Sequence, residues 1–139
     1  MTILVDANVI LDVLQERQPH YSDSEFVLRL CATRKVKGVI AAHSLPTMFY
    51  VLKKYYNLHD IRQALIDVCN IFSISSINEQ KIMTALYNES FIDFEDNLQE
   101  ECAVENEADY IITRDQKDYK MSRIPALHPA EFKILYEQC

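Results

Sequence analysis

Residues 2–14 read TILVDANVILDVL, and this stretch decides the fold class. Residues 3–5 form a short apolar run that is typical of a buried strand, while residues 8–14 carry apolar side chains at helical spacing. Asp6 stands between the two, directly after the strand. A short buried strand followed at once by a helix indicates the first half of a strand–helix–strand unit with parallel strands.

The alternation of strand and helix continues along the chain. Further short apolar strands are predicted at residues 39–42, 71–74, 110–113 and 124–127. Helices are predicted at 22–35 with Ser22 as N-cap, from 44, at 59–70, from 78, at 93–106 with Asp93 as N-cap, and around 132–135. Gly38 is expected to end the helix before the second strand. We therefore expect an α/β fold with three α/β/α layers, a mostly parallel sheet of about four or five strands, and one domain over residues 1–139.

Length and composition exclude several classes of protein. The chain has 139 residues, 49% of them apolar, and a domain of this size folds without disulfides. No run reaches the roughly 20 apolar residues of a membrane span, and the N-terminus lacks the cationic start of a signal peptide. We expect a cytoplasmic protein with no membrane partner, whose cysteines serve as small apolar residues. They are Cys31, Cys69, Cys102 and Cys139.

The scarcity of glycine argues against a nucleotide-binding loop. Gly38 is the only glycine, whereas loops that cradle phosphate need several for close backbone approach. P-loop hydrolases and dinucleotide-binding folds are therefore disfavoured. The net charge of −7 also argues against a nucleic-acid binder, because phosphate contacts are made by Lys and Arg. Bound cations would offset part of this negative charge locally.

Acidic side chains follow two of the predicted strands. Asp6 comes after the first strand and Asp115 after the fourth, while Asp96 lies in the first turn of the helix that Asp93 is expected to cap. Each Asp also has an ordinary structural explanation, either as an N-cap or as a favourable charge at a helix N-terminus. If three carboxylates converge, their repulsion is relieved by a divalent cation, and an all-oxygen ligand set favours Mg²⁺ or Mn²⁺.

Three segments, in order, resemble the PIN domain, a family of metal-dependent ribonucleases that includes many toxins of bacterial toxin–antitoxin pairs. They read ILVDANVILDVL, DFEDNLQEECAVENEADYIITRD and QKDY, and the resemblance extends over residues 3–135. It implies that the metal ligands and catalytic residues are Asp6, Asp96 and Asp115. It also implies that Asn8 supports the site by hydrogen bonding and that Thr113 is the Ser or Thr usual beside the last acidic position. Asp118 stands where some members carry a further acidic residue.

One position departs from the family pattern. Most members carry a glutamate on the helix after the second strand, whereas Thr47 takes the matching position and residues 39–54 contain no acid. A set of three carboxylates instead of four weakens metal affinity or a second metal position. Arg114 replaces a common Asn, and is expected either to contact a substrate phosphate or to form a salt bridge that restrains Asp115. His43 is expected to be a hydrogen-bonded structural residue at the border of the pocket.

The leading hypothesis is a Mg²⁺- or Mn²⁺-dependent endoribonuclease that hydrolyses RNA phosphodiester bonds. The resemblance adds an antitoxin protein and a second copy of the chain as expected partners. The alternative is a PIN-like module with little catalysis that binds RNA or a protein, which Thr47 and the acidic charge favour. A phosphatase of the haloacid-dehalogenase type would need an Asp in place of Asn8. A receiver domain would need a phosphorylatable Asp after the third strand, where Ser75 and Ser76 occur.

Overall fold

The computed structural model describes residues 1–139, and its centre is one five-stranded sheet. The strands are β1 (Thr2–Val5), β2 (Lys37–Ala41), β3 (Ser73–Ser75), β4 (Tyr110–Ile112) and β5 (Ala126–Leu127). They lie in the order β3-β2-β1-β4-β5, and every pair is parallel. The predicted α/β class with a parallel sheet is confirmed, and the first strand of the chain occupies the middle of the sheet.

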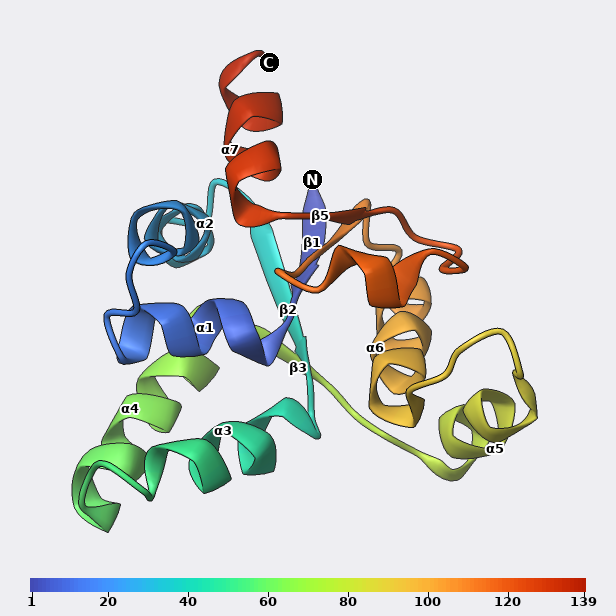
Figure 1. The fold of residues 1–139 in the computed structure, drawn as a ribbon, viewed down its shortest axis with the longest axis horizontal. Coiled ribbons are helices and arrows are strands. Elements are labelled where there is room, and N and C mark those ends of the chain that lie inside the picture. The colour runs from blue at the N-terminus through green and yellow to red at the C-terminus, as the bar shows by residue number, and fades with distance from the viewer.

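Helices cover both faces of the sheet. They are α1 (Ala7–Leu14), α2 (Tyr21–Ala32), α3 (Ser44–Leu52), α4 (Leu58–Ile71), α5 (Glu79–Tyr87), α6 (Phe94–Glu105) and α7 (Pro129–Glu137), with a short 3₁₀ helix η1 (Gln116–Tyr119). Helix α6 contacts β1, β2 and β4, and α5 packs on α6, while the other five helices lie on the opposite side (Figure 1). This arrangement has the three layers expected from the sequence.

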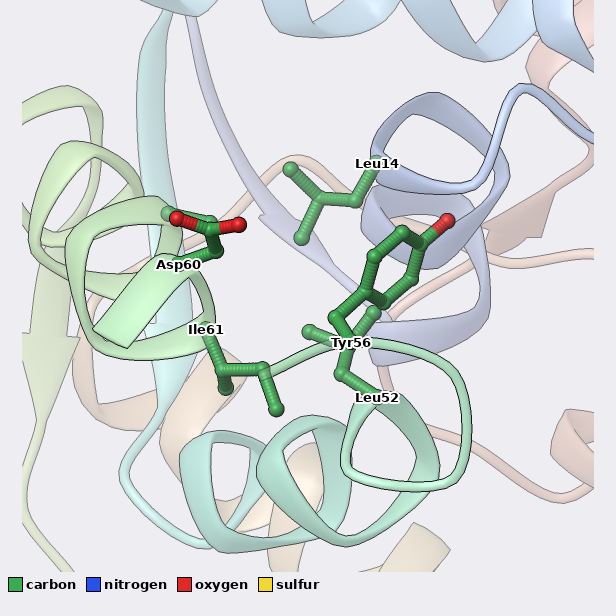
Figure 2. A pocket seen from close by; sticks show the side chains of 6 residues that line it. Leu14, Leu52, Tyr56, Asp60 and Ile61 are labelled. Carbon is green, nitrogen blue, oxygen red and sulfur yellow. The ribbon is translucent and has the colours of Figure 1, made fainter. Parts of the chain in front are cut away.

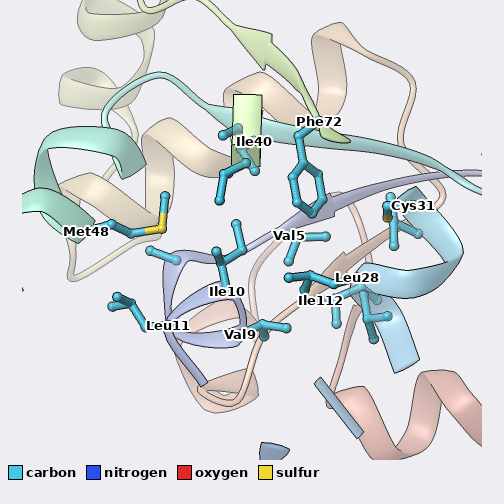
Figure 3. Close-up of a cluster of buried hydrophobic side chains, with 14 of the residues drawn as sticks. Val5, Val9, Ile10, Leu11, Leu28, Cys31, Ile40, Met48, Phe72 and Ile112 are labelled. Carbon is cyan, nitrogen blue, oxygen red and sulfur yellow. The ribbon is translucent and has the colours of Figure 1, made fainter. Parts of the chain in front are cut away.

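Side chains alternate between two hydrophobic clusters along β1. Ile3 and Val5 enter the larger cluster, which Figure 3 shows between the sheet and the helices that include α1 and α2. Leu4 enters the smaller cluster, where it meets Cys102 and Ala103 of α6. Because both faces of the strand are buried, its sequence is a continuous apolar run and not an alternating one.

The start of α2 differs from the prediction. The helix begins at Tyr21, its N-cap position is His20, and Ser22 lies exposed inside the helix and does not cap it. The N–H of Tyr21 donates to the carbonyl oxygen of Arg17 at 2.8 Å, and the N–H of Ser24 donates to that of His20 at 3.1 Å. The carbonyl of Arg17 thus satisfies the N–H of the first helical residue, and the helix starts one residue before Ser22 without a side-chain cap.

The third strand begins later than predicted. Residue 71 is still helical, and β3 starts at Ser73. The buried stripe of α4, which is formed by Ile61, Leu65 and Val68, continues at helical spacing to Phe72, which is 3% exposed. Packing of this stripe on the core therefore extends the helix through residues whose local sequence also suits a strand.

Gly38 lies inside β2 and does not end a helix, so that prediction is wrong. A Cβ atom at this position would come within 2.6 Å of Cδ1 of Phe72 and 2.7 Å of Sγ of Cys31. The missing side chain lets β2 pass directly beneath these two residues, which belong to the ends of α4 and α2. The requirement for glycine here comes from tertiary contact and not from a turn.

The four cysteines form no disulfide, and Cys31 and Cys102 are buried in α2 and α6. None of the helices combines the length and the apolar character needed to span a bilayer.

Candidate active site at the carboxyl ends of the strands

Strand β1 lies in the middle of the sheet, and the later strands are placed first on one side of it and then on the other. Strands β2 and β3 are added on one side of β1, and β4 and β5 on the other, so the topological switch point lies between β1 and β4. Ligand sites of open parallel sheets form beyond the carboxyl ends of the strands at such a point. Asp6 follows β1 and Thr113 follows β4, and the N–H of Asp6 donates to the carbonyl oxygen of Ile112 at 2.9 Å.

Hydrogen bonds join four of the predicted site residues across this switch point. The hydroxyl of Thr113 donates to Oδ2 of Asp6 at 2.9 Å. The side-chain amide of Asn8 donates to Oδ2 of Asp115 at 3.1 Å and approaches Oγ1 of Thr113 at 3.4 Å. The N–H of Asp115 donates to Oγ1 of Thr113 at 3.0 Å. Thr113 is fully buried, so these bonds fix both carboxylates relative to the sheet.

Capping does not explain Asp6 or Asp115. Both occupy N-cap positions, of α1 and η1, but neither side chain makes a capping hydrogen bond. Asp93 behaves differently, because its Oδ1 accepts the N–H of Asp96 at 3.0 Å, which confirms it as the N-cap of α6. The carboxylates after β1 and β4 are thus left available for another role, while Asp93 stabilises a helix end.

The third predicted carboxylate, Asp96, is held by a tyrosine. The hydroxyl of Tyr119 donates to Oδ1 of Asp96 at 3.1 Å and accepts a hydrogen bond from Nε2 of Gln99 at 3.1 Å. Tyr119 is 3% exposed and Gln99 is 4% exposed, so this chain of bonds is shielded from water. Burial and the nearby carboxylates raise the pKa of Tyr119, which therefore stays protonated and remains a donor.

Charge repulsion links Asp96 to the pair beside β1. Burial raises the pKa of Asp96 to about 7, and the charges of Asp93 and Asp6 add to the increase. Burial also raises the pKa of Asp6, and the charge of Asp115 contributes in the same direction, although the hydrogen bond from Thr113 opposes it. These carboxylates are thus near enough to one another to resist simultaneous ionisation.

A hard divalent cation fits the chemistry of these groups. The acidic donors are all carboxylate oxygens, which is the ligand type that Mg²⁺ and Mn²⁺ prefer. No three His, Cys, Asp or Glu side chains of the structure lie closely enough together to hold one ion. The raised pKa values of Asp6 and Asp96 mark a local excess of negative charge that a cation would relieve.

Arg114 pairs with Asp12 and not with Asp115. Its Nε donates to Oδ2 of Asp12 at 2.8 Å, and the hydroxyl of Ser24 donates to the same oxygen at 3.0 Å. Asp12 is fully buried, and Nη1 of Arg17 lies 3.9 Å from its other oxygen. The salt bridge therefore ties the loop after β4 to α1 and α2. The prediction of a salt bridge is correct in kind, but its predicted partner is wrong.

Thr47 takes the position where most family members carry a glutamate, and His43 is the N-cap residue of the same helix, α3. The hydroxyl of Thr47 donates to the carbonyl oxygen of His43 at 3.1 Å, so it is engaged within its own helix. Burial lowers the pKa of His43, despite the opposing charges of Glu95 and Asp6. Nδ1 of His43 is buried without a hydrogen-bond partner, whereas the ring interacts with the backbone of Glu95, so the expected structural role of His43 stays a prediction.

Three residues of this region were not predicted from the sequence, and one predicted residue, Asp118, lies at the edge of the site. Asp118 is exposed on η1, and its charge acts on Asp96. The residues that were missed are Asp12, Gln99 and Tyr119. An Asp inside the apolar stretch 7–14 is a signal for a buried paired charge, and it could have identified Asp12. Gln99 and Tyr119 lie within two of the segments that resemble the family, but their pairing could not be predicted, because it depends on how η1 packs against α6.

A separate apolar cavity lies away from these carboxylates. It has a volume of about 150 Å³ and is lined by Leu14, Leu52, Tyr56, Asp60, Ile61 and Ala64 (Figure 2). Its walls come from the C-terminal end of α1, the end of α3 and the start of α4, whereas Asp6 and His43 lie at the opposite ends of α1 and α3. The cavity is therefore not part of the candidate active site.

Comparison with known proteins places this geometry in a family. A sequence profile described as the PIN domain matches residues 2–117, which include β1 to β4 and all the residues of the switch point. The chain belongs to the PIN-domain family. A curated relative of this PIN domain, Ribonuclease VapC1 of Aquifex aeolicus, is 28% identical over 124 residues, which is 84% of this chain and 83% of the relative.

Solved structures share the fold of this PIN domain. A toxin–antitoxin complex from Klebsiella pneumoniae matches with a TM-score of 0.68 and 22% identity, over 91% of this chain and 97% of that one. VapBC2 from Rickettsia felis, bound to a DNA fragment from its promoter, matches with a TM-score of 0.66 and 15% identity, over 92% and 98%. At these identities the likeness concerns the fold, and β5 and α7 lie beyond the profile match in this PIN domain.

Proposed function

We propose that this PIN domain is an endoribonuclease that depends on Mg²⁺ or Mn²⁺ and hydrolyses RNA phosphodiester bonds. The observation that carries the proposal is the hydrogen-bonded set Asp6, Asn8, Thr113 and Asp115 at the switch point. Asp96 adds a carboxylate whose charge interacts with that of Asp6. The likeness to a curated ribonuclease supports the same reaction class.

Each of these side chains has a distinct task in the proposed reaction. Asp6, Asp96 and Asp115 would hold the cation, which supplies charge stabilisation at the phosphate and a bound water of lowered pKa. Thr113 and Asn8 orient the carboxylates of Asp6 and Asp115 through the bonds described above. Such fixed orientation reduces the reorganisation needed when the substrate reacts.

Cleavage assays with charge-neutralising variants test the proposal. We expect the wild type to cut single-stranded RNA in Mn²⁺ and to lose activity in EDTA. Asp96→Asn keeps the size of the side chain but removes its charge, and should lower kcat at least about 100-fold. Asp67→Asn is the matched control, because Asp67 is an exposed carboxylate on α4. Wild-type protein that neither binds Mn²⁺ nor cuts RNA would refute the nuclease proposal.

A binding module without efficient catalysis is the second candidate. Two observations favour it: Thr47 stands where a fourth acid is expected, and no three ligating side chains converge closely enough to hold an ion. RNA binding without cleavage in the same assays, together with Mn²⁺ affinity that Asp96→Asn leaves unchanged, would favour this candidate over the nuclease.

We also propose that the chain is the toxin of a toxin–antitoxin pair and that it forms a homodimer. The supporting observation is that several solved neighbours of the same fold are toxin–antitoxin complexes. Exposed apolar side chains offer surface for partners, among them Tyr55, Leu58, Ile66, Leu86 and Tyr87. Light scattering of the purified chain tests the dimer. The toxin role is tested by expressing the chain in bacteria: growth should stop, and co-expression of a neighbouring gene for the antitoxin should restore it.

A further inference from the structure

The candidate site lacks cations that could receive an RNA strand. The charges that raise the pKa of the site's carboxylates are themselves carboxylates, namely Asp115 for Asp6, and Asp93, Asp6 and Asp118 for Asp96. Arg114 directly precedes Asp115 in the sequence, but its guanidinium is engaged with Asp12. A polyanionic substrate that approaches this edge of the sheet therefore needs positive charge from another surface.

Such charge occurs in a hollow beside Asp96, which we call the η1 hollow. Its volume is about 370 Å³, and it lies between η1 and the loop before α6. Its lining includes Ser90, Ile92, Lys117, Lys120 and Met121. Asp93 and Asp118 complete the wall, and Asp93 bonds directly to the N–H of Asp96. The hollow therefore adjoins the first turn of α6, which carries Asp96, a residue that the proposed function places in catalysis.

The two lysines of the η1 hollow are free to bind an anion. Lys117 and Lys120 are exposed and form no ion pair, although Asp93 and Asp118 line the same hollow. Tyr119 stands between them and is buried, with its hydroxyl on Asp96. The segment 117–120 thus positions Asp96 through Tyr119 and presents two lysine ammonium groups on either side of that tyrosine.

The apolar part of the η1 hollow suits a nucleobase. Ile92 is fully exposed at 108% and Met121 is 66% exposed, so neither contributes to the hydrophobic core. Polarisable and branched apolar side chains beside ammonium groups match a ligand with an apolar ring face and an anionic phosphate. A volume of about 370 Å³ lies at the small end of ligand pockets, which is the size range of one nucleotide.

We propose that the η1 hollow is a substrate subsite that binds one nucleotide of single-stranded RNA next to the bond to be cut. Lys117 and Lys120 contact phosphate, and Ile92 and Met121 contact the base. The inference rests on the proposed ribonuclease function and adds to it the surface that guides the strand into the site. A protein partner that uses the same lysines is the competing occupant, and the experiment distinguishes the two.

The test compares two double variants with the same change in charge. Lys117→Gln/Lys120→Gln removes the cations of the hollow, and Lys53→Gln/Lys54→Gln removes an exposed pair on another surface, after the end of α3. Binding of a fluorescent 12-nucleotide RNA is measured by anisotropy in EDTA, at several salt concentrations, so that the RNA stays intact. The KM for cleavage and the affinity for Mn²⁺ are measured separately.

We expect the hollow variant to bind RNA about tenfold more weakly than wild type. Loss of two phosphate contacts should reduce the slope of log affinity against log salt by about 1.4, since each contact on a single strand contributes about 0.7. Its Mn²⁺ affinity should match that of wild type, because the substitutions leave all three carboxylates in place. Ile92→Ser/Met121→Ser should weaken binding several-fold without changing the slope.

Three results overturn the subsite. The first is RNA affinity in the hollow variant equal to that of wild type. The second is an equal loss of RNA affinity in the Lys53/Lys54 control. The third is a wild-type protein that binds no RNA, together with a hollow variant that binds a protein partner more weakly than wild type does. Failure of the nuclease proposal has a different signature. In that case wild type binds RNA with the predicted dependence on the hollow but does not cut it in Mn²⁺.

Discussion

At the scale of single residues, the hydroxyl group of Tyr119 gives the clearest test of how Asp96 is positioned in the candidate site. It bridges Gln99 and Asp96 inside the protein, and a phenylalanine would keep the ring but not the bridge. We expect Tyr119→Phe to lower kcat about tenfold, which corresponds to about 1.4 kcal/mol of lost orientation of Asp96. The KM for RNA should change little, since Tyr119 is buried and out of reach of the strand.

Tyr110→Phe is the matched control for this prediction. Its ring packs against Phe132, and no hydrogen bond involves its hydroxyl. Both variants should stay within about 1 kcal/mol of the wild-type free energy of unfolding, so a selective loss of kcat and Mn²⁺ affinity in Tyr119→Phe identifies positioning of Asp96. Equal kcat in the two variants would show that the hydroxyl has no such role.

The protonation of Asp96 makes a prediction about pH. Burial and neighbouring carboxylates raise its pKa from the ordinary 3.8 to about 7, so between these values the folded protein keeps a proton that the unfolded chain has lost. The contribution of Asp96 to stability is therefore complete below about pH 4 and falls as pH rises to about 7. Asp96→Asn should show a weaker decrease of the free energy of unfolding over this range, measured by urea titration.

Metal binding should show the opposite dependence on pH. A cation binds the ionised carboxylate, so Mn²⁺ must displace the proton of Asp96 below about pH 7. We expect the affinity for Mn²⁺ to rise up to about tenfold per pH unit from pH 6 to 7 and to level off above it. Calorimetry in two buffers of different ionisation enthalpy measures the released proton, and the absence of proton release at pH 6 would contradict the prediction.

At the scale of elements, Gly38 sets how closely β2 approaches α2 and α4. A methyl group there would overlap the ring of Phe72 and the sulfur of Cys31. We expect Gly38→Ala to lower the free energy of unfolding by about 1–3 kcal/mol through overpacking. In the double variant Gly38→Ala/Phe72→Leu the smaller side chain leaves room for the methyl group. Its loss should be less than the sum of the two single losses, and strict additivity would exclude this contact as the cause.

Sequence reasoning located some elements better than others for physical reasons. The β1 and β4 runs are buried on both faces, so their apolar character and the carboxylates after them were visible locally. Ser22 was misassigned as a cap because the helix already begins at Tyr21, whose N–H donates to the carbonyl oxygen of Arg17 in the preceding turn. The boundary between α4 and β3 was missed because residues 71 and 72 suit both states, and only packing on the core decides between them.

At the scale of the whole molecule, the sequence places Asp6 and Asp115 after two strands of a parallel sheet, and the family resemblance adds Asn8 and Thr113 to the same site. The structure brings these four together through hydrogen bonds. The partner of Arg114 could not be predicted, because it depends on the packing of α1 against the loop after β4. The bridge from Tyr119 to Asp96 likewise requires contact between η1 and α6, which no spacing in the sequence encodes.

The pairing of β1 with β4 also has a consequence for the order of folding. Ile3 lies opposite Tyr110, and the bond between Thr113 and Asp6 spans 107 residues. Closing so long a loop is entropically unfavourable until the intervening helices have compacted the chain. During synthesis the first strand can therefore pair with β2 long before β4 has emerged. Asp6 and Asp115 can meet only after residue 115 has been synthesised, so a shorter nascent chain carries no assembled site.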